Sequence, residues 1–541
     1  MPGSRKVAIF ATNTKDHNRI GMSPSKTFAR GFVFEDDLKT GRYQVGRRGV
    51  AGVAVSNGRE VVHTDATGYY ALPIDGPCCI FISKPAGYDL PLDENGQPCY
   101  FYRYYPEGTP AGVNMHYERL EPTGPLPGLI NFPLYRRKKK GDGFQALVFG
   151  DIQPERREEI GFFREMIGAE LARREADFMI PLGDLTWDRL DFFPDVKEAL
   201  GAVGHPFFPV AGNHDINFRP ADARYTRDTF VRYFGPGYYS FNYGKVHFVV
   251  LDDIGYSGWE VAQDVKGETV GYLDERQLEW LANDLRGVPD DRLIFLCSHI
   301  PLYTNIAPEV DYRNVRNRAA LFEVLRDRRH LFHVAAHTHW VEQVDLRDGG
   351  WTGDAPFHSL IAGAACGAWW KGPKDERGHP VRLGMDGVPN GFFRFQFEGN
   401  RFRMEYCPTG HRECVQMSIR LAGDGLVTHE LLANIYRASP RAAVRCRING
   451  SAPLPMGRTV KEDPYVEQYL DEHRDDYPDW VRARPVAHLW RAVLPAPLPP
   501  GEHLIEIAAR EPGGDLIRES RRFHIEAPRE PRATRGVEMG G

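Results

Sequence analysis

The pattern of apolar and polar residues changes character twice along the chain. From residue 27 to 135 apolar and polar residues alternate, and Asn-Gly at 57–58 is typical of a hairpin turn. From 144 to 410 short apolar runs alternate with segments of helical periodicity. From 411 to 527 the strand pattern returns. The pattern predicts a central α/β domain between an N-terminal and a C-terminal β-sandwich domain.

The central region contains several short apolar runs that are typical of buried strands. These runs are 146–150, 177–183, 206–212, 246–252, 292–298 and 331–337. Helical periodicity predicts helices over 159–176, 191–204 and 273–287. Strands and helices in alternation are typical of an α/β fold.

Polar side chains stand at the C-terminal ends of five of these apolar runs. They are Asp151, Asp184, Asn213 with His214, His299, and His337 with His339. In an open α/β sheet, ligands bind beyond the carboxyl ends of the strands. Taken singly, such a histidine is more often a hydrogen-bonded structural residue, and Asp184 alone could cap a helix. Taken together, so many polar groups at the ends of buried strands need a partner, and oxygen and nitrogen donors at one edge suit a site for two metal ions.

The same residues, in the same order, resemble the motifs of the calcineurin-like metallophosphoesterases. They stand here as "DIQ", "GD", "GNHD", "SH" and "AHTH", and the resemblance covers residues 144–410. It implies a metallophosphoesterase core, a β-sandwich flanked by helices. The N-terminal region also resembles a carboxypeptidase-regulatory-like, immunoglobulin-like module. Both flanking β regions, together with "GAACGAWWKGP", resemble parts of a bacterial subgroup of the family.

The resemblance also implies a role for each residue. Asp184 would bridge two divalent metal ions. Asp151, Gln153 and His339 would complete one metal site, and Asn213, His299 and His337 the other. His214 would contact the substrate and stabilise developing charge or protonate the leaving oxygen, held by Asp215 or another nearby acid.

Gln153 departs from the family pattern, which has histidine there. An amide oxygen is a harder ligand than imidazole, which favours Mn²⁺ or Mg²⁺ over Zn²⁺ or an iron pair. The D-x-Q start also resembles that of the manganese-dependent ADP-ribose/CDP-alcohol phosphatases. We therefore take Mn²⁺ as the first candidate, with Mg²⁺, iron and Zn²⁺ as alternatives.

The candidate substrate-binding residues are Trp187, Arg189, Trp369 and Trp370. Their aromatic faces suit a base or a sugar ring, although packing of a domain junction is an equal alternative. We expect a phosphodiesterase or pyrophosphatase acting on a small nucleotide- or sugar-linked ester. The alternatives are a phosphomonoesterase and, in a different class, a catalytically inert glycan-binding protein.

Composition narrows the range of partners and compartments. The net charge of −5 over 541 residues argues against a nucleic-acid-binding protein, and the apolar runs are too short to span a membrane. Eight cysteines in this length do not form a disulfide framework. The N-terminal sequence lacks the apolar core of a signal peptide, so we expect a cytoplasmic protein, or a periplasmic or secreted one if a signal was removed. No oligomeric state is predicted.

Overall fold

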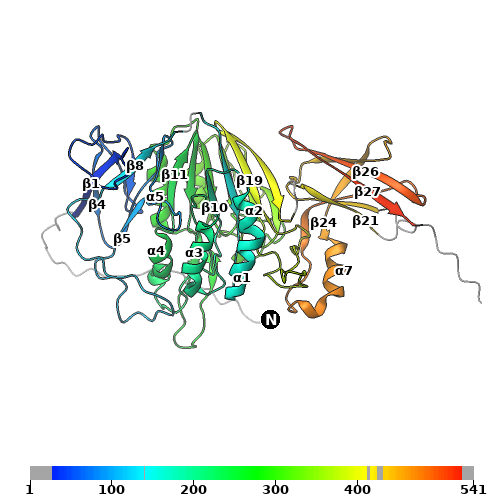
Figure 1. Ribbon diagram of the computed structural model, residues 1–541, viewed down its shortest axis with the longest axis horizontal. Coiled ribbons are helices and arrows are strands. Elements are labelled where there is room, and N and C mark those ends of the chain that lie inside the picture. Colours follow the sequence, from blue (N-terminus) through cyan, green and yellow to red (C-terminus); the bar gives the residue numbers. More distant parts are fainter. Residues whose placement is uncertain (1–26, 139–140, 411–414, 423–429, 527–541) are drawn as a thin grey trace, which may run out of the picture.

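The computed structural model describes residues 27–138, 141–410, 415–422 and 430–526. Three parts lie in a row along its longest axis: an N-terminal β part, a central α/β part and a C-terminal β part (Figure 1). Within those described ranges, none of the helices has the length and apolar character needed to cross a membrane. The N-terminal segment on which the compartment prediction rests lies outside the described residues.

The N-terminal part consists of two four-stranded sheets, in the orders β4-β1-β8-β6 and β3-β2-β5-β7. Their bounds are β1 (Thr27–Glu35), β2 (Ala54–Ser56), β3 (Val61–His63), β4 (Tyr69–Ile74), β5 (Cys78–Ile82), β6 (Tyr88–Asp89), β7 (Phe101–Tyr104) and β8 (Phe132–Arg136). The predicted all-β character is therefore observed, and the assignment to the immunoglobulin-like class stays a prediction.

The central part has two facing sheets, a four-stranded one in the order β10-β9-β19-β20 and a six-stranded one in the order β11-β12-β15-β16-β18-β17. Their bounds are β9 (Phe144–Phe149), β10 (Phe178–Pro181), β11 (Tyr239–Tyr243), β12 (Val246–Val250), β15 (Leu293–Cys297), β16 (Leu331–Ala335), β17 (Val341–Asp345), β18 (Phe357–Ala362), β19 (Gly391–Glu398) and β20 (Arg401–Pro408). A small hairpin adds β13 (Ile254–Tyr256) and β14 (Thr269–Gly271). The pairs β9/β10, β12/β15, β15/β16 and β16/β18 are parallel.

Aromatic side chains fill the space between the two central sheets. Phe178 of β10 contacts Phe248 of β12 with ring centres 5.2 Å apart, and Phe397 of β19 lies 5.6 Å from the same ring. The helices are α1 (Arg157–Phe162), α2 (Ala169–Ala172), α3 (Phe193–Gly201), α4 (Asp228–Phe234), α5 (Glu275–Leu285) and α6 (Arg318–Leu325). The continuous helix that contains α1 and α2 lies side by side with α3 and α4 in front of the sheets (Figure 1). The core is thus a β-sandwich flanked by helices, as expected.

Two segments differ from the sequence expectation. The helix expected over 159–176 contains a π-helical stretch, Phe163–Gly168, between α1 and α2. The strand expected over 206–212 runs beside β10, with Phe208 N donating to Met179 O and Val210 N to Pro181 O, but it forms only one ladder bridge. Pro181 at the end of β10 has no N–H to donate to Phe208 O, so the next bond of the parallel ladder is missing.

The C-terminal part is a seven-stranded sheet in the order β21-β22-β25-β24-β23-β26-β27. Its elements are β21 (Met417–Ala422), β22 (Glu430–Ile435), β23 (Ala443–Ile448), β24 (Leu454–Glu462), α7 (Pro464–Glu472), β25 (Pro485–Val493), β26 (Gly501–Arg510) and β27 (Leu516–Ile525). The sheet curls until its edge strands approach each other, since Arg521 Nη1 of β27 donates to Ile419 O of β21 at 2.8 Å. The curled sheet encloses its own apolar core around Trp490 and Ile507.

The N-terminal part shares one continuous apolar core with the central part. Phe81 of β5 packs against Trp280 of α5, with ring centres 6.0 Å apart, and Tyr100 lies 4.8 Å from Tyr239 of β11. The backbones also meet, because Asn242 N donates to Lys84 O at 2.8 Å. Neither part therefore closes its core alone.

Removing residues 1–135 should make the chain insoluble, because it would expose Trp280 and Tyr239, which are at most 1 % exposed here. The measurement is the soluble fraction after expression, beside the full chain. A truncated protein that stays soluble and unfolds cooperatively would contradict the shared core.

Candidate metal centre

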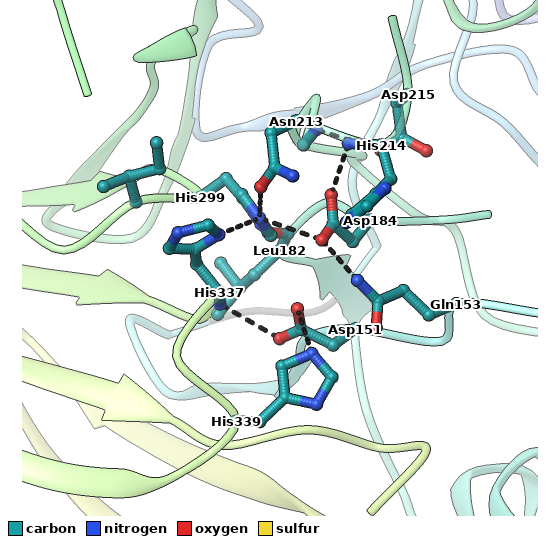
Figure 2. Close-up of polar contacts among 12 residues, drawn as sticks. Asp151, Gln153, Leu182, Asp184, Asn213, His214, Asp215, His299, His337 and His339 are labelled. Atoms are coloured by element: carbon teal, nitrogen blue, oxygen red, sulfur yellow. Dashed lines mark hydrogen bonds and ion pairs between the residues drawn. The ribbon is translucent and has the colours of Figure 1, made fainter. Parts of the chain in front are cut away.

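The polar residues at the strand ends converge on one point of the central part (Figure 2). Asp151 follows β9, Asp184 follows β10, and Asn213 follows the extended segment beside β10. His299 follows β15, and His337 and His339 follow β16. The structure therefore brings together all seven residues that the sequence predicted as metal ligands, Gln153 included.

His299 lies at the centre of the first half of the cluster. Its Nδ1 donates to Leu182 O at 2.7 Å, which turns Nε2 towards the other predicted ligands. Nε2 lies 3.3 Å from Asp184 Oδ2, 3.1 Å from Asn213 Oδ1 and 3.2 Å from His337 Nδ1. His337 in turn donates through Nε2 to Tyr312 O at 2.9 Å. Both imidazoles are thus oriented by backbone carbonyls, as metal-binding histidines commonly are.

The protonation of these groups fits a cation site. Burial alone lowers the pKa of His299, but Asp184 and then Asp151 outweigh it and raise that pKa to about 10. Burial and the neighbouring His299 lower the pKa of His337 to about 3, which keeps its ring neutral. His299 therefore carries one additional proton, which faces the side chains of Asp184, Asn213 and His337. Metal binding replaces protons on such ligands. Ligand atoms of Asp184, His299 and His337 all lie within 4.8 Å of one another, close enough to hold one ion.

Asp151, Gln153 and His339 form the second half of the cluster. Asp151 Oδ2 accepts the His337 backbone N–H at 3.1 Å. Its Oδ1 lies 3.4 Å from His339 Nε2, and this buried oxygen has no hydrogen-bond partner among the described residues. A buried carboxylate oxygen without a partner is costly, and a cation would satisfy it. The donor set therefore fits a second ion.

Gln153 differs from the expectation in its orientation. Its Nε2 donates to Asp184 Oδ2 at 2.6 Å (Figure 2). Its Oε1 lies 4.0 Å from Cys366 Sγ. Rotation of the terminal amide by half a turn would exchange these two atoms. The predicted ligand role through the side-chain oxygen needs that rotation.

The backbone at the cluster is held in an uncommon conformation. Asp151, Gln153, Asp184, His337 and His339 all have positive φ, between 42° and 69°. Non-glycine residues adopt this region rarely, at a cost of about 1–3 kcal/mol each, and such residues gather at functional sites. Five of the seven predicted ligands are therefore fixed in place by strained loops.

His214 stands beside the cluster and is held by Asp188. Its backbone N–H donates to Asp184 Oδ1 at 2.9 Å, and its ring Nδ1 lies 3.1 Å from Asp188 Oδ1. Lys266 Nζ reaches the same Asp188 oxygen at 3.0 Å. Burial lowers the pKa of His214, but the carboxylates of Asp184 and Asp188 outweigh it, so the net shift is upward.

Asp215, named first as the partner of His214, has a different place. Its carboxylate accepts the backbone N–H groups of Leu185, Thr186 and Gly212 at 2.9–3.1 Å. It therefore braces the loops that carry Asp184 and Asn213. Asp188 is the other nearby acid that holds His214. Its position in the sequence, four residues after Asp184, could have indicated this role.

The four predicted substrate-binding residues divide into two groups. Trp369 stacks on His339 with ring centres 4.1 Å apart, and Trp187 lies 5.4 Å from His214. Trp370 is instead buried, with its indole N–H donating to Ile152 O at 2.7 Å, so it supports the loop after Asp151 and cannot contact a substrate. Arg189 is paired with Asp191 at 2.8 Å and lies over the Phe192 ring.

The described residues also include two side chains near the site that sequence reasoning did not single out. Lys266 pairs with Asp188, and Trp480 contacts both Trp187 and Trp369. Trp480 comes from the C-terminal part, almost three hundred residues after Trp187, and nothing in the local sequence marks it.

Comparison with known protein families gives three matches along the chain. Residues 144–341 match the calcineurin-like phosphoesterase family. Residues 38–120 match the N terminal, and residues 360–515 the C terminal, of calcineurin-like phosphoesterase. The C-terminal match begins at 360, within the region 144–410 that the sequence assigned to the central domain, so the boundary at 410 stays a prediction.

Among solved structures, a purple acid phosphatase, PPD1, from yellow lupin seeds is similar over 66% of this chain and 67% of its own, with 13% identity and a TM-score of 0.35. Chaetomium thermophilum Vps29 is similar over 71% of this chain and 99% of its own, with 11% identity and a TM-score of 0.20. No curated protein matches the chain. The three family matches lie in order and include every motif of the metal cluster. The chain therefore belongs to the calcineurin-like phosphoesterases and is a metal-dependent phosphoesterase that carries the N-terminal and C-terminal parts of that family.

Proposed function

We propose that the protein hydrolyses a small phosphodiester or pyrophosphate linked to a nucleoside or a sugar. The observation that carries this proposal is the position of two tryptophan rings, which contact two histidines at the edge of the metal cluster. Trp369 stacks on His339 and Trp187 lies beside His214. A ring attached to a phosphate at the cluster would meet these aromatic faces, whereas a simple phosphomonoester of a small alcohol has nothing to place there.

The strand-end residues would hold two divalent cations. Asp184 would serve both, with Asp151, Gln153 and His339 on one side and Asn213, His299 and His337 on the other. When bound, the cations supply positive charge that neutralises phosphate oxygens and acidifies water. Oxygen donors outnumber nitrogen donors among the seven residues, which favours Mn²⁺ over Zn²⁺.

His214 would act on the leaving oxygen. Its ring Nδ1 faces Asp188, so Nε2 is the atom free to donate a proton. Asp188 would position the ring and keep it protonated, and Lys266 would hold Asp188 in place. This arrangement suits general acid catalysis, in which the histidine protonates the departing alcohol or phosphate.

The test compares 4-nitrophenyl phosphate with bis(4-nitrophenyl) phosphate on the Mn²⁺-loaded protein. We expect a higher kcat/KM for the diester. A clear preference for the monoester would favour the phosphomonoesterase alternative.

Replacing Gln153 tests whether its side chain is a metal ligand. Gln153→His should retain both ions but shift preference towards Zn²⁺, because imidazole is the softer donor. Gln153→Ala should weaken the site formed by Asp151 and His339 more than the other site. Calorimetric titration of each variant with Mn²⁺ and Zn²⁺ gives the affinities directly. If both variants bind the two metals as the native protein does, Gln153 only orients Asp184 through the hydrogen bond seen here.

A further inference from the structure

Trp480 brings the C-terminal part of the chain to the rim of the metal cluster. Its ring centre lies 4.6 Å from that of Trp369, almost perpendicular at 83°, and 5.8 Å from that of Trp187. The Trp187 and Trp369 rings are themselves 5.9 Å apart. Trp480 nevertheless stays 45% exposed, so the three indoles form an open corner instead of a closed core.

The loop that carries Trp480 is firmly held. Arg474 donates through Nη1 to Val481 O at 3.0 Å and through Nη2 to Pro478 O at 2.7 Å, which clamps the loop on both sides of Trp480. The loop is also joined to the segment after Trp369, since Gly372 N donates to Asp476 O at 3.2 Å.

A small apolar cluster joins the same two segments. Buried Val481 and Tyr477 pack with Ala368, and Trp369 packs against this cluster. The cluster fixes the position of Trp480 relative to Trp369 before any ligand arrives. A binding wall that is already in place loses little conformational entropy on binding.

We propose that Trp480 is a specificity-determining residue whose exposed indole face stacks on a planar ring carried by the substrate, such as a nucleobase. The proposal rests on the proposed diester hydrolysis, because the phosphate must lie on the metal cluster for the ring to reach the corner. Because the Trp480 and Trp369 rings are almost perpendicular, one bound ring can stack on the face of one indole and meet the edge of the other. Offset stacking and edge-to-face contact are the arrangements that aromatic pairs prefer. The C-terminal part would thereby form one wall of the active site.

The test uses two diesters that share a leaving group, thymidine 5′-(4-nitrophenyl) phosphate and methyl 4-nitrophenyl phosphate. Trp480→Ala should raise KM for the thymidine ester about tenfold or more, as loss of one base–aromatic contact does, with little change in kcat. KM for the methyl ester should stay the same. Trp480→Phe should keep most of the affinity, because it retains an aromatic face.

The matched control is Tyr465→Ala. Tyr465 belongs to α7 of the same C-terminal part, is 41% exposed, and contacts Arg420 and Tyr469. The Tyr465→Ala substitution should leave the KM values for both esters unchanged. Metal content and melting temperature should match the native protein in all three variants.

Other outcomes separate this proposal from the proposed function. Equal effects of Trp480→Ala on both esters, or a lower melting temperature with a uniform loss of kcat, would show that Trp480 only joins the two parts.

If the native protein hydrolyses neither ester, the diesterase function fails. Calorimetric binding of thymidine 5′-monophosphate then decides on Trp480: at least tenfold weaker binding to Trp480→Ala supports the stacking role, and equal binding overturns it. Tighter, Trp480-dependent binding of glucose 1-phosphate would also overturn it, since that ligand has no planar ring.

Discussion

Replacing Asp184 by asparagine is expected to abolish metal-dependent stabilisation and to lower kcat on the order of 10³-fold. Asp184 contacts His299, Gln153 and the His214 backbone, so it lies between the two halves of the cluster. Asparagine keeps its shape but removes the negative charge that two cations would share. Metal-ion catalysis contributes several kcal/mol, and each 1.4 kcal/mol corresponds to about a factor of ten in rate.

The measurement for Asp184 includes a readout that does not depend on turnover. In the native protein Mn²⁺ should raise the melting temperature, because a ligand that binds only the folded state stabilises it. In Asp184→Asn this rise should vanish. Asp291→Asn, which removes a charge from an exposed ion pair with Lys245, is the matched control and should behave as the native protein. An undiminished Mn²⁺ effect in Asp184→Asn would show that the ions bind elsewhere.

Replacing His214 by alanine should lower kcat by about 10²–10⁴-fold while both metal ions are retained, the range expected for the loss of a general acid. The loss should be smaller for a nitrophenyl ester than for an alkyl ester, because nitrophenolate leaves without a proton. Asp188→Asn should cause a smaller loss with the same dependence on the leaving group, since Asp188 acts through His214.

His205→Ala is the control for the His214 variant, because His205 contacts only a backbone carbonyl, Arg174 O, among its described polar contacts. It should leave kcat unchanged. Equal losses of His214→Ala on good and poor leaving groups would leave that histidine an electrostatic role without proton transfer. Loss of metal from His214→Ala would instead make it part of the metal cluster.

The strand ends were predictable because each ligand is adjacent to the apolar run that positions it. Asp151, Asp184 and His299 each follow a buried strand within three residues, so local sequence contains most of the needed information. The order of the motifs supplied the rest. The α/β core and the β character of both flanking parts followed from periodicity alone.

Other features depend on contacts that local sequence does not encode. Trp369 and Trp370 are neighbours of the same type, yet one stacks on His339 and the other is buried against Ile152 O. Both residues have positive φ, 57° and 58°, a backbone conformation that local propensity does not predict for tryptophan. Trp480 reaches the site only through the packing of two distant loops. The sequence could not decide whether Asp188 or Asp215 holds His214. That depends on the backbone N–H groups, which already occupy the carboxylate of Asp215.

The core shared by the N-terminal and central parts bears on how the chain unfolds. Trp280 and Tyr239 of the central part are covered on the N-terminal side by Phe81 and Tyr100. Loss of the N-terminal part would uncover both rings, so these two parts should unfold in one cooperative transition. The C-terminal sheet encloses a core of its own and can therefore unfold in a separate transition.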